Sequence, residues 1–191
     1  MVDNRSLQDV DWSKLPIPEN DGAAAHLAGA PVADVALPST AGGSVSLATV
    51  SGRTVLFIYP MTGTPGVALP DGWDVIPGAR GCTPHACAFR DLHAELTRAG
   101  AAAVFGLSTQ TLEEQKATVE RLHLPFPLLS DACLAFAHAM SLPEMEVSGK
   151  AMIKRMALII DDGTITHVFY PVFPPDRNAA DVLEWLKENP L

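Results

Sequence analysis

The pattern of apolar and polar positions divides the chain into short strands and amphipathic helices. Thr54–Tyr59 and Ala102–Leu107 are nearly continuous apolar runs, typical of strands that are buried on both faces of a sheet. The pair Asp162-Gly163 is a tight-turn signal and predicts a hairpin between two flanking apolar segments. Further extended segments are expected at residues 32–37, 44–47, 126–129, 156–160 and 164–170.

Helical spacing of apolar residues predicts four helices. The first covers about residues 84 to 99, and Gly100 suits its end. Thr111 and Glu114 form a capping box that opens a second helix, which reaches about Leu122. A third is expected at 132–140, and Asp176 is expected to cap a fourth at about 177–188.

The resulting order is βαβαβαββα after an N-terminal hairpin. Strands that alternate with helices predict a central, mostly parallel sheet, and the late hairpin makes it mixed. We therefore expect an α/β, thioredoxin-like fold over residues 31–191. Residues 1–30 show no periodicity and are interpreted as an arm around the domain or a loose extension.

Composition narrows the class of partner. The 191-residue chain carries a formal net charge of −9, which argues against binding to nucleic acid or to anionic membranes. No apolar run approaches the roughly 18 residues of a membrane span. The polar N-terminus does not resemble a secretory signal, so we expect a cytoplasmic protein, in which a close cysteine pair is more often catalytic or metal-binding than structural.

The segment Gly81–Asp91 holds the candidate chemistry. Cys82 stands just before Pro84, a residue favoured where helices open. A thiol at a helix N-terminus faces unpaired N–H groups and the positive end of the dipole, which favour the nucleophilic thiolate. Cys87, five residues later, is close enough in the sequence to react with a product that forms on Cys82.

The same residues allow other interpretations. Cys82, His85 and Cys87 could bind zinc, but three ligands within six residues do not have the usual tetrahedral spacing. His85 could tune the thiol or be a solvated helix residue. Cys133 is expected in the core. Four further histidines are expected to be structural: His93, His123, His138 and His167.

These motifs resemble the peroxiredoxins, and most closely their bacterioferritin-comigratory or Q-type branch. The resemblance covers about residues 31–188. It rests on the Cys82-Thr-x-x-x-Cys87-x-Phe-Arg-Asp string, which is specific, and on weaker matches in the right order. Those are Tyr59-Pro60, Leu129-Ser130-Asp131 and Arg155 six residues before Asp161.

The resemblance implies a thiol peroxidase that needs no metal or organic cofactor. Cys82 would reduce hydrogen peroxide or an organic hydroperoxide and become a sulfenic acid. Cys87 would then form an intramolecular disulfide with it, and thioredoxin or a similar thiol reductant would reset the enzyme. Arg155 matches the arginine that activates thiolate and peroxide, and Arg80 is a second candidate. Arg90 is expected to fix the helix through a carboxylate.

One departure from the family pattern concerns the segment before the cysteine. The pattern Pro-x-x-x-Thr-x-x-Cys would put the cysteine at Val67, but Cys82 follows 15 residues later. We interpret residues 67–81 as an inserted loop. It is expected to be a lid, a reductant-docking surface or an oligomer contact. Pro60 is the family's proline, and either Thr62 or Thr64 is its threonine.

Two other functions remain open at this point. One is a thioredoxin-like thiol-disulfide oxidoreductase, although that class normally has a Cys-x-x-Cys motif, which this chain lacks. The other is a non-enzymatic redox sensor on the same fold. The protein is expected to be a monomer or a homodimer.

Overall fold

A five-stranded mixed sheet lies at the centre of the computed structural model, which describes residue 7 and residues 9–191. Its strand order is β5-β4-β3-β8-β9. The first three strands of this order run parallel, and β8 and β9 add antiparallel pairs. This confirms the thioredoxin-like fold. The strands are β3 (Arg53–Ile58), β4 (Ala103–Ser108), β5 (Leu128–Ser130), β8 (Met156–Asp161) and β9 (Thr164–Phe169).

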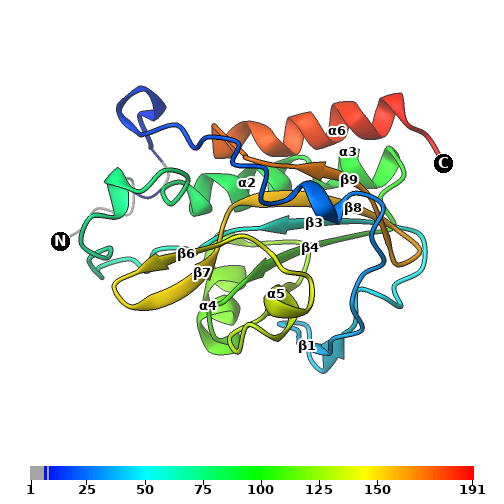
Figure 1. Cartoon of the computed structure of the whole chain (residues 1–191), viewed down its shortest axis with the longest axis horizontal. Helices are drawn as coiled ribbons and strands as arrows, with labels where there is room; N and C mark the ends of the chain where they lie inside the picture. Colours follow the sequence, from blue (N-terminus) through cyan, green and yellow to red (C-terminus); the bar gives the residue numbers. More distant parts are fainter. Residues whose placement is uncertain (1–6, 8) are drawn as a thin grey trace.

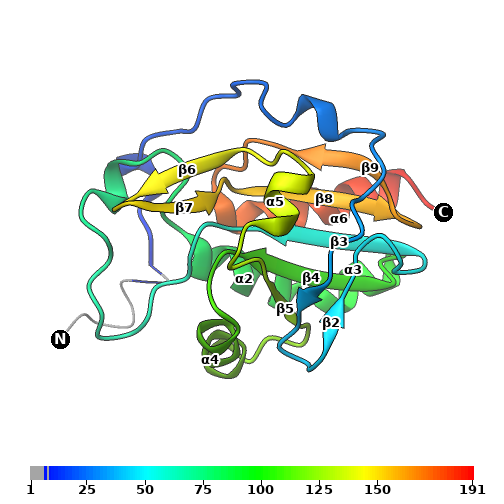
Figure 2. The same cartoon turned by 60° about the horizontal axis from the view of Figure 1, so that its bottom comes forward.

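Helices flank this sheet on both sides (Figures 1 and 2). Helices α2, α3 and α6 cover one face, α5 lies on the other, and α4 runs beside the edge strand β5. Both candidate cysteines belong to α2, in the layer that α6 also occupies. The helices are α2 (Cys82–Asp91), α3 (His93–Arg98), α4 (Leu112–Leu122), α5 (Ala135–Ala139) and α6 (Asn178–Glu188).

The central strand β3 is buried on both faces, as its apolar run predicts. Phe57 points into the core below α2, where its ring stacks on Phe89 with the centroids 4.5 Å apart. Leu56 and Ile58 point into the opposite core with Phe136 of α5. Successive side chains of β3 therefore point into two different cores, one on each face of the sheet. Each core packs one layer of helices against the sheet.

The structure confirms one predicted helix start and changes others. The capping box of α4 is confirmed, because Thr111 and Glu114 each bond the other's backbone N–H. The helix expected at 84–99 is instead two helices that meet at Leu92, whose backbone angles are not helical, and α2 begins earlier, at Cys82. The capping role given to Asp176 is wrong. Asp176 belongs to a 3-10 turn before α6, η4 (Pro175–Arg177), and its side chain accepts a hydrogen bond from Trp12.

Two small hairpins stand outside the central sheet. The expected N-terminal hairpin is shorter than predicted, with β1 (Leu37–Pro38) and β2 (Ser44–Val45). A second hairpin, β6 (Glu144–Val147) and β7 (Lys150–Ile153), was not predicted. Its turn has positive φ at Ser148 (50°) and Gly149 (76°), so the Ser-Gly pair was a usable signal.

The N-terminal arm follows the domain surface over residues 9–30 (Figure 2). It contains two 3-10 turns, η1 (Trp12–Lys14) and η2 (Ala25–Leu27). Its end pairs with β9, because the Gly29 N–H donates to the Ile165 carbonyl at 2.8 Å and the Ile165 N–H donates to Ala30 at 3.0 Å. Within residue 7 and residues 9–191, no helix combines the length and apolar character needed to cross a bilayer.

Candidate active site

Cys82 is the first residue of α2 and is almost fully buried, at 3% exposure. Gly81 precedes it with φ +100°, and a Cβ there would lie 2.7 Å from the Trp12 ring and 2.9 Å from Pro175. Only glycine fits this conformation and this space. The chain therefore places the thiol at the N-terminal end of the helix, where unpaired N–H groups and the positive end of the helix dipole lie.

Arg155 lies between β7 and β8 and reaches the thiol. Its Nη2 is 3.1 Å from Cys82 Sγ, and the same nitrogen donates to the carbonyls of Gly78, Ala79 and Arg80 at 3.1–3.3 Å. The side chain is 2% exposed, so this cation acts at close range and with little screening. The structure thus brings together the two residues expected from opposite halves of the chain.

A further pair of side chains orients Arg155. Its Nη1 is 2.9 Å from His85 Nδ1, and His85 Nε2 is 2.8 Å from Asn178 Oδ1. Since a guanidinium only donates, Nδ1 accepts and Nε2 carries the proton that is donated to Asn178. Burial, together with the charge of Arg155, holds the pKa of His85 well below its ordinary value.

These contacts correct the interpretation of His85 as a solvated residue, because its side chain is fully buried. Both ring nitrogens are engaged by Arg155 and Asn178, which argues against a zinc-binding role for His85. In the part of the chain that the structure describes, no group of three or more His, Cys, Asp or Glu side chains is arranged to hold a metal ion. The one-turn spacing between Cys82 and His85 indicated that both side chains lie on the same side of the helix. No sequence signal indicated that Asn178 would contact His85.

Cys87 is the sixth residue of α2 and is half-buried. It borders a surface hollow that Asp91 and Asp176 also line. Burial raises the pKa of the Cys87 thiol, and the charge of Arg90 opposes that rise. Arg90 pairs with Asp91 at 2.8 Å, as expected, and also donates to the carbonyl of Leu122 at 2.9 Å.

Cys133 is exposed, so the expectation that it lies in the core is wrong. The cause is a turn after β5. The Asp131 carboxylate accepts the N–H groups of Phe136 and Ala137 at 3.0 and 2.8 Å, which starts α5 later than predicted. Cys133 therefore falls in the turn and not on the buried face of a helix.

The residues expected from the strand end have hydrogen-bond or cavity partners other than the thiol, although Met61 and Gly63 of the same segment line the cavity beside Cys82. Pro60 is buried and lines a separate hollow with Gln110. The Thr62 backbone N–H and hydroxyl lie 2.9 and 3.0 Å from Gln110 Oε1, and its hydroxyl is also 3.0 Å from that of Thr118. Thr64 is exposed, and its carbonyl accepts the Val67 N–H at 3.1 Å.

The segment 67–81, which we interpret from the sequence as an insertion, folds back over the thiol. A cavity of about 10 Å³ beside Cys82 is lined by Leu69, Trp73 and Arg80 of the loop. That volume corresponds to about one water-sized sphere. Trp73 belongs to the 3-10 turn η3 (Trp73–Val75) and is 3% exposed, while Arg80 pairs with Asp74 at 3.1 Å. Thr83, which the sequence did not single out, also borders this cavity.

Comparison with known proteins places this arrangement in a family. The Redoxin family model matches residues 27–183. Peroxiredoxin Q, chloroplastic, of Sedum lineare is 29% identical over 147 residues, which cover 76% of this chain and 70% of that protein.

Solved structures agree with this match. Peroxidoxin BcpB from Mycobacterium tuberculosis superposes with a TM-score of 0.68 at 32% identity, covering 85% of this chain and 97% of that one. Xanthomonas campestris peroxiredoxin Q gives a TM-score of 0.64 at 24% identity, over 92% and 96% of the two chains, and supports the fold. This chain therefore belongs to the peroxiredoxins, in their bacterioferritin-comigratory or Q-type branch.

Proposed function

We propose that this chain, a member of a family of thiol peroxidases, reduces hydrogen peroxide and organic hydroperoxides through the Cys82 thiolate. The observation that carries the proposal is the 3.1 Å contact between Arg155 Nη2 and Cys82 Sγ at a helix N-terminus. This cation and the helix end both lie against the sulfur, and donors aimed at the charge that develops during its attack on the peroxide stabilise the transition state.

The reaction transfers one oxygen to sulfur. The thiolate attacks the terminal peroxide oxygen, an S–O bond forms and the O–O bond breaks. The departing hydroxide or alkoxide takes up a proton and leaves as water or alcohol, and Cys82 is left as a sulfenic acid. Because the cavity beside the thiol holds about one water-sized sphere, one of its covering side chains must move before a hydroperoxide can enter.

Cys87 is the proposed resolving thiol. Both cysteines are free, and they stand at the first and sixth positions of a continuous helix. In a helix these positions are separated by about 7.5 Å of rise, whereas a disulfide requires Cα atoms within about 7 Å. The first turn of α2 must therefore unwind, after which a thioredoxin-like dithiol can reduce the disulfide.

The test is mass spectrometry after one equivalent of hydrogen peroxide. We expect wild-type protein to lose two hydrogen masses as a Cys82–Cys87 disulfide. Cys87→Ser should instead hold a sulfenic acid on Cys82 that dimedone labels, and Cys82→Ser should consume no peroxide. Cys133→Ser is the matched control and should behave as wild type. Full peroxide consumption by Cys82→Ser, or a Cys82–Cys133 disulfide, would contradict the proposal.

A further inference from the structure

The N-terminal arm reaches the cavity that contains the thiol. Leu7 is 6% exposed and lines this cavity of about 10 Å³ together with Cys82 and Thr83. Leu7 also packs against Gly63, which lines the same cavity, because a Cβ at Gly63 would lie 2.8 Å from a Leu7 methyl group. A side chain of the arm therefore helps to close the approach to the sulfur.

Trp12 places a second side chain of the arm at the start of α2. Its ring lies over Gly81, the residue before Cys82, where a Cβ would be 2.7 Å away. Trp12 Nε1 donates to Asp176 Oδ2 at 3.0 Å, and its ring meets that of Phe173 edge-on with the centroids 6.2 Å apart. Trp12 thus fixes the arm both to the segment before α2 and to the turn before α6.

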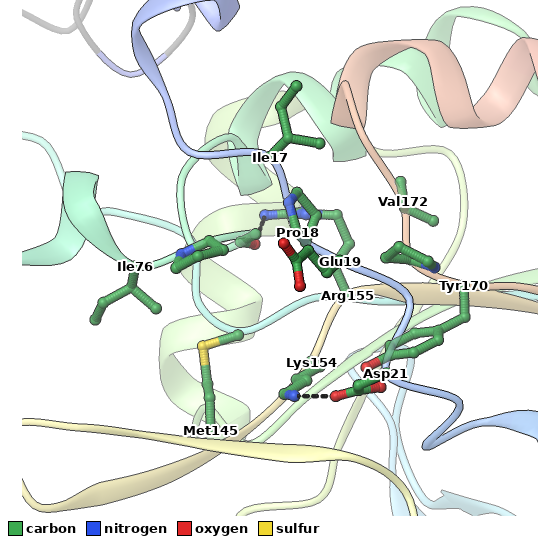
Figure 3. A pocket seen from close by; sticks show the side chains of 13 residues that line it. Ile17, Pro18, Glu19, Asp21, Ile76, Met145, Lys154, Arg155, Tyr170 and Val172 are labelled. Atoms are coloured by element: carbon green, nitrogen blue, oxygen red, sulfur yellow. Dashed lines mark hydrogen bonds and ion pairs between the residues drawn. The ribbon is translucent and has the colours of Figure 1, made fainter.

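Few bonds hold this part of the arm to the domain. Over residues 9–28, all of them described, no backbone-to-backbone hydrogen bond joins the arm to the sheet or its helices, and the first is that of Gly29 with Ile165. After Trp12, the next side-chain bond to the domain is at Asp21, which accepts from Lys154 Nζ at 2.8 Å (Figure 3). A segment held in this way opens at a lower free-energy cost than a hydrogen-bonded core.

The other side chains around the cavity are held more firmly. Trp73 belongs to the core below α2, and Met61 and Leu69 pack against that core. Arg80 forms an ion pair within its own loop. Since one covering side chain has to move before a peroxide can enter, movement of Leu7 with the arm is the route of lowest cost.

The arm is also an addition to the matched domain. The Redoxin match covers residues 27–183, so Leu7 and Trp12 both lie outside it. Neither side chain carries a group that could take part in the proposed oxygen transfer. The two residues can therefore control the thiol without belonging to the reaction itself.

We propose that the N-terminal arm is an autoinhibitory lid on the active site, in which Leu7 closes the approach to Cys82 and Trp12 holds the lid shut. This inference concerns the regulation of the proposed peroxidase and rests on that function. The thiol reacts in the open form, so the observed rate constant is that of the open form multiplied by the fraction of molecules that are open. Opening also removes the Trp12 ring from Gly81, beside the helical turn that must unwind for the disulfide.

The experiment measures how fast Cys82 reacts in the reduced full-length protein. Hydrogen peroxide and iodoacetamide are the two reagents, and both products are mapped by rapid quench and mass spectrometry. Leu7→Ala and Trp12→Ala should each raise both rate constants about tenfold, because each removes a contact that keeps the lid closed. Cys133 is exposed, and its alkylation in the same samples is the internal reference.

Two further variants are the controls. Leu7→Met keeps the volume and apolar character of the side chain and should react as wild type. Ile17→Ala truncates another arm residue, which is 68% exposed and lines a different cavity (Figure 3), and should also react as wild type. A lid acts on both reagents alike, whereas displacement of Arg155 would slow the peroxide reaction relative to alkylation.

The outcomes separate the lid from the chemistry beneath it. Wild-type rates in both Leu7→Ala and Trp12→Ala, or an equal rise in Ile17→Ala, would overturn the lid while leaving the peroxidase intact. If hydrogen peroxide leaves wild-type Cys82 unmodified while iodoacetamide still reacts faster in the two arm variants, the proposed function fails and the arm is still shown to cover the thiol.

Discussion

Arg155 contacts the thiol, three carbonyls and His85 with one guanidinium group, so its replacement tests the site at the scale of single residues. Arg155→Met keeps an unbranched apolar stem and removes the cation. We expect the rate constant of Cys82 with hydrogen peroxide to fall by about 100-fold or more in stopped-flow measurements. Arg98→Met, at an exposed ion pair with Glu95, is the charge-matched control. A wild-type rate in Arg155→Met would remove Arg155 from the mechanism.

His85 gives a prediction about stability and pH. Its folded pKa is depressed below the ordinary 6.5, so below about pH 6.5 the unfolded chain binds a proton that the folded protein excludes. The free energy of unfolding should therefore decrease as pH falls, by up to about 1.4 kcal/mol per pH unit from this group. His85→Gln should lack this part of the slope.

Urea unfolding at pH 7.5, 6.5 and 5.5 measures the difference between the two proteins. His123→Asn, at an exposed position with φ +52°, is the control that should keep the wild-type slope. Equal slopes in wild type and His85→Gln would contradict the buried neutral state of His85.

At the scale of elements, the proposed Cys82–Cys87 disulfide requires α2 to adopt a second form in which its first turn is unwound. In the reduced protein the His85 N–H donates to the Gly81 carbonyl at 3.0 Å, a bond of the first turn. Formation of the Cys82–Cys87 disulfide should expose this amide and its neighbours to hydrogen exchange, while β3 amides stay protected. Cys87→Ser treated with one equivalent of peroxide is the control and should keep the first turn protected. Retained protection in the disulfide form would exclude unwinding.

Elements with strong local signals were predictable. The apolar run of β3 and the capping box of α4 depend on residues within a few positions of each other, and both are confirmed. The break at Leu92 and the hairpin at 144–153 were missed. A periodic pattern continues across a break such as Leu92, and the hairpin's short strands have a mixed burial pattern with little apolar contrast.

At the scale of the whole molecule, Arg53 ties β3 to β8 and to the C-terminal segment. It pairs with Asp161 through two bonds of 2.7 and 2.8 Å and also contacts the Asn189 carbonyl. Asp161→Asn leaves the buried Arg53 cation without its carboxylate partner and should cost about 3 kcal/mol in the free energy of unfolding. Arg53→Met should cost less, because the side chain of Asp161 is 22% exposed and can be solvated.

Chemical denaturation of the two variants and of the double variant checks this order. Asp162→Asn is the control for the loss of a charge at the same turn, where the Asp162 carboxylate accepts the Gly52 N–H. A larger loss in Arg53→Met than in Asp161→Asn would contradict the argument from burial.

Local order along the chain was sufficient to predict the mixed α/β fold and a helix that opens beside Cys82, although not its first residue, and the family resemblance pointed to Arg155. Periodicity, capping and turn chemistry act over a few residues, so one sequence displays them. Other features depended on how distant segments pack. His85 meets Arg155 across 70 positions and Asn178 across 93, and the loop at 67–81 folds back over the thiol. Such contacts follow from the stacking of layers on the sheet, which no short pattern records.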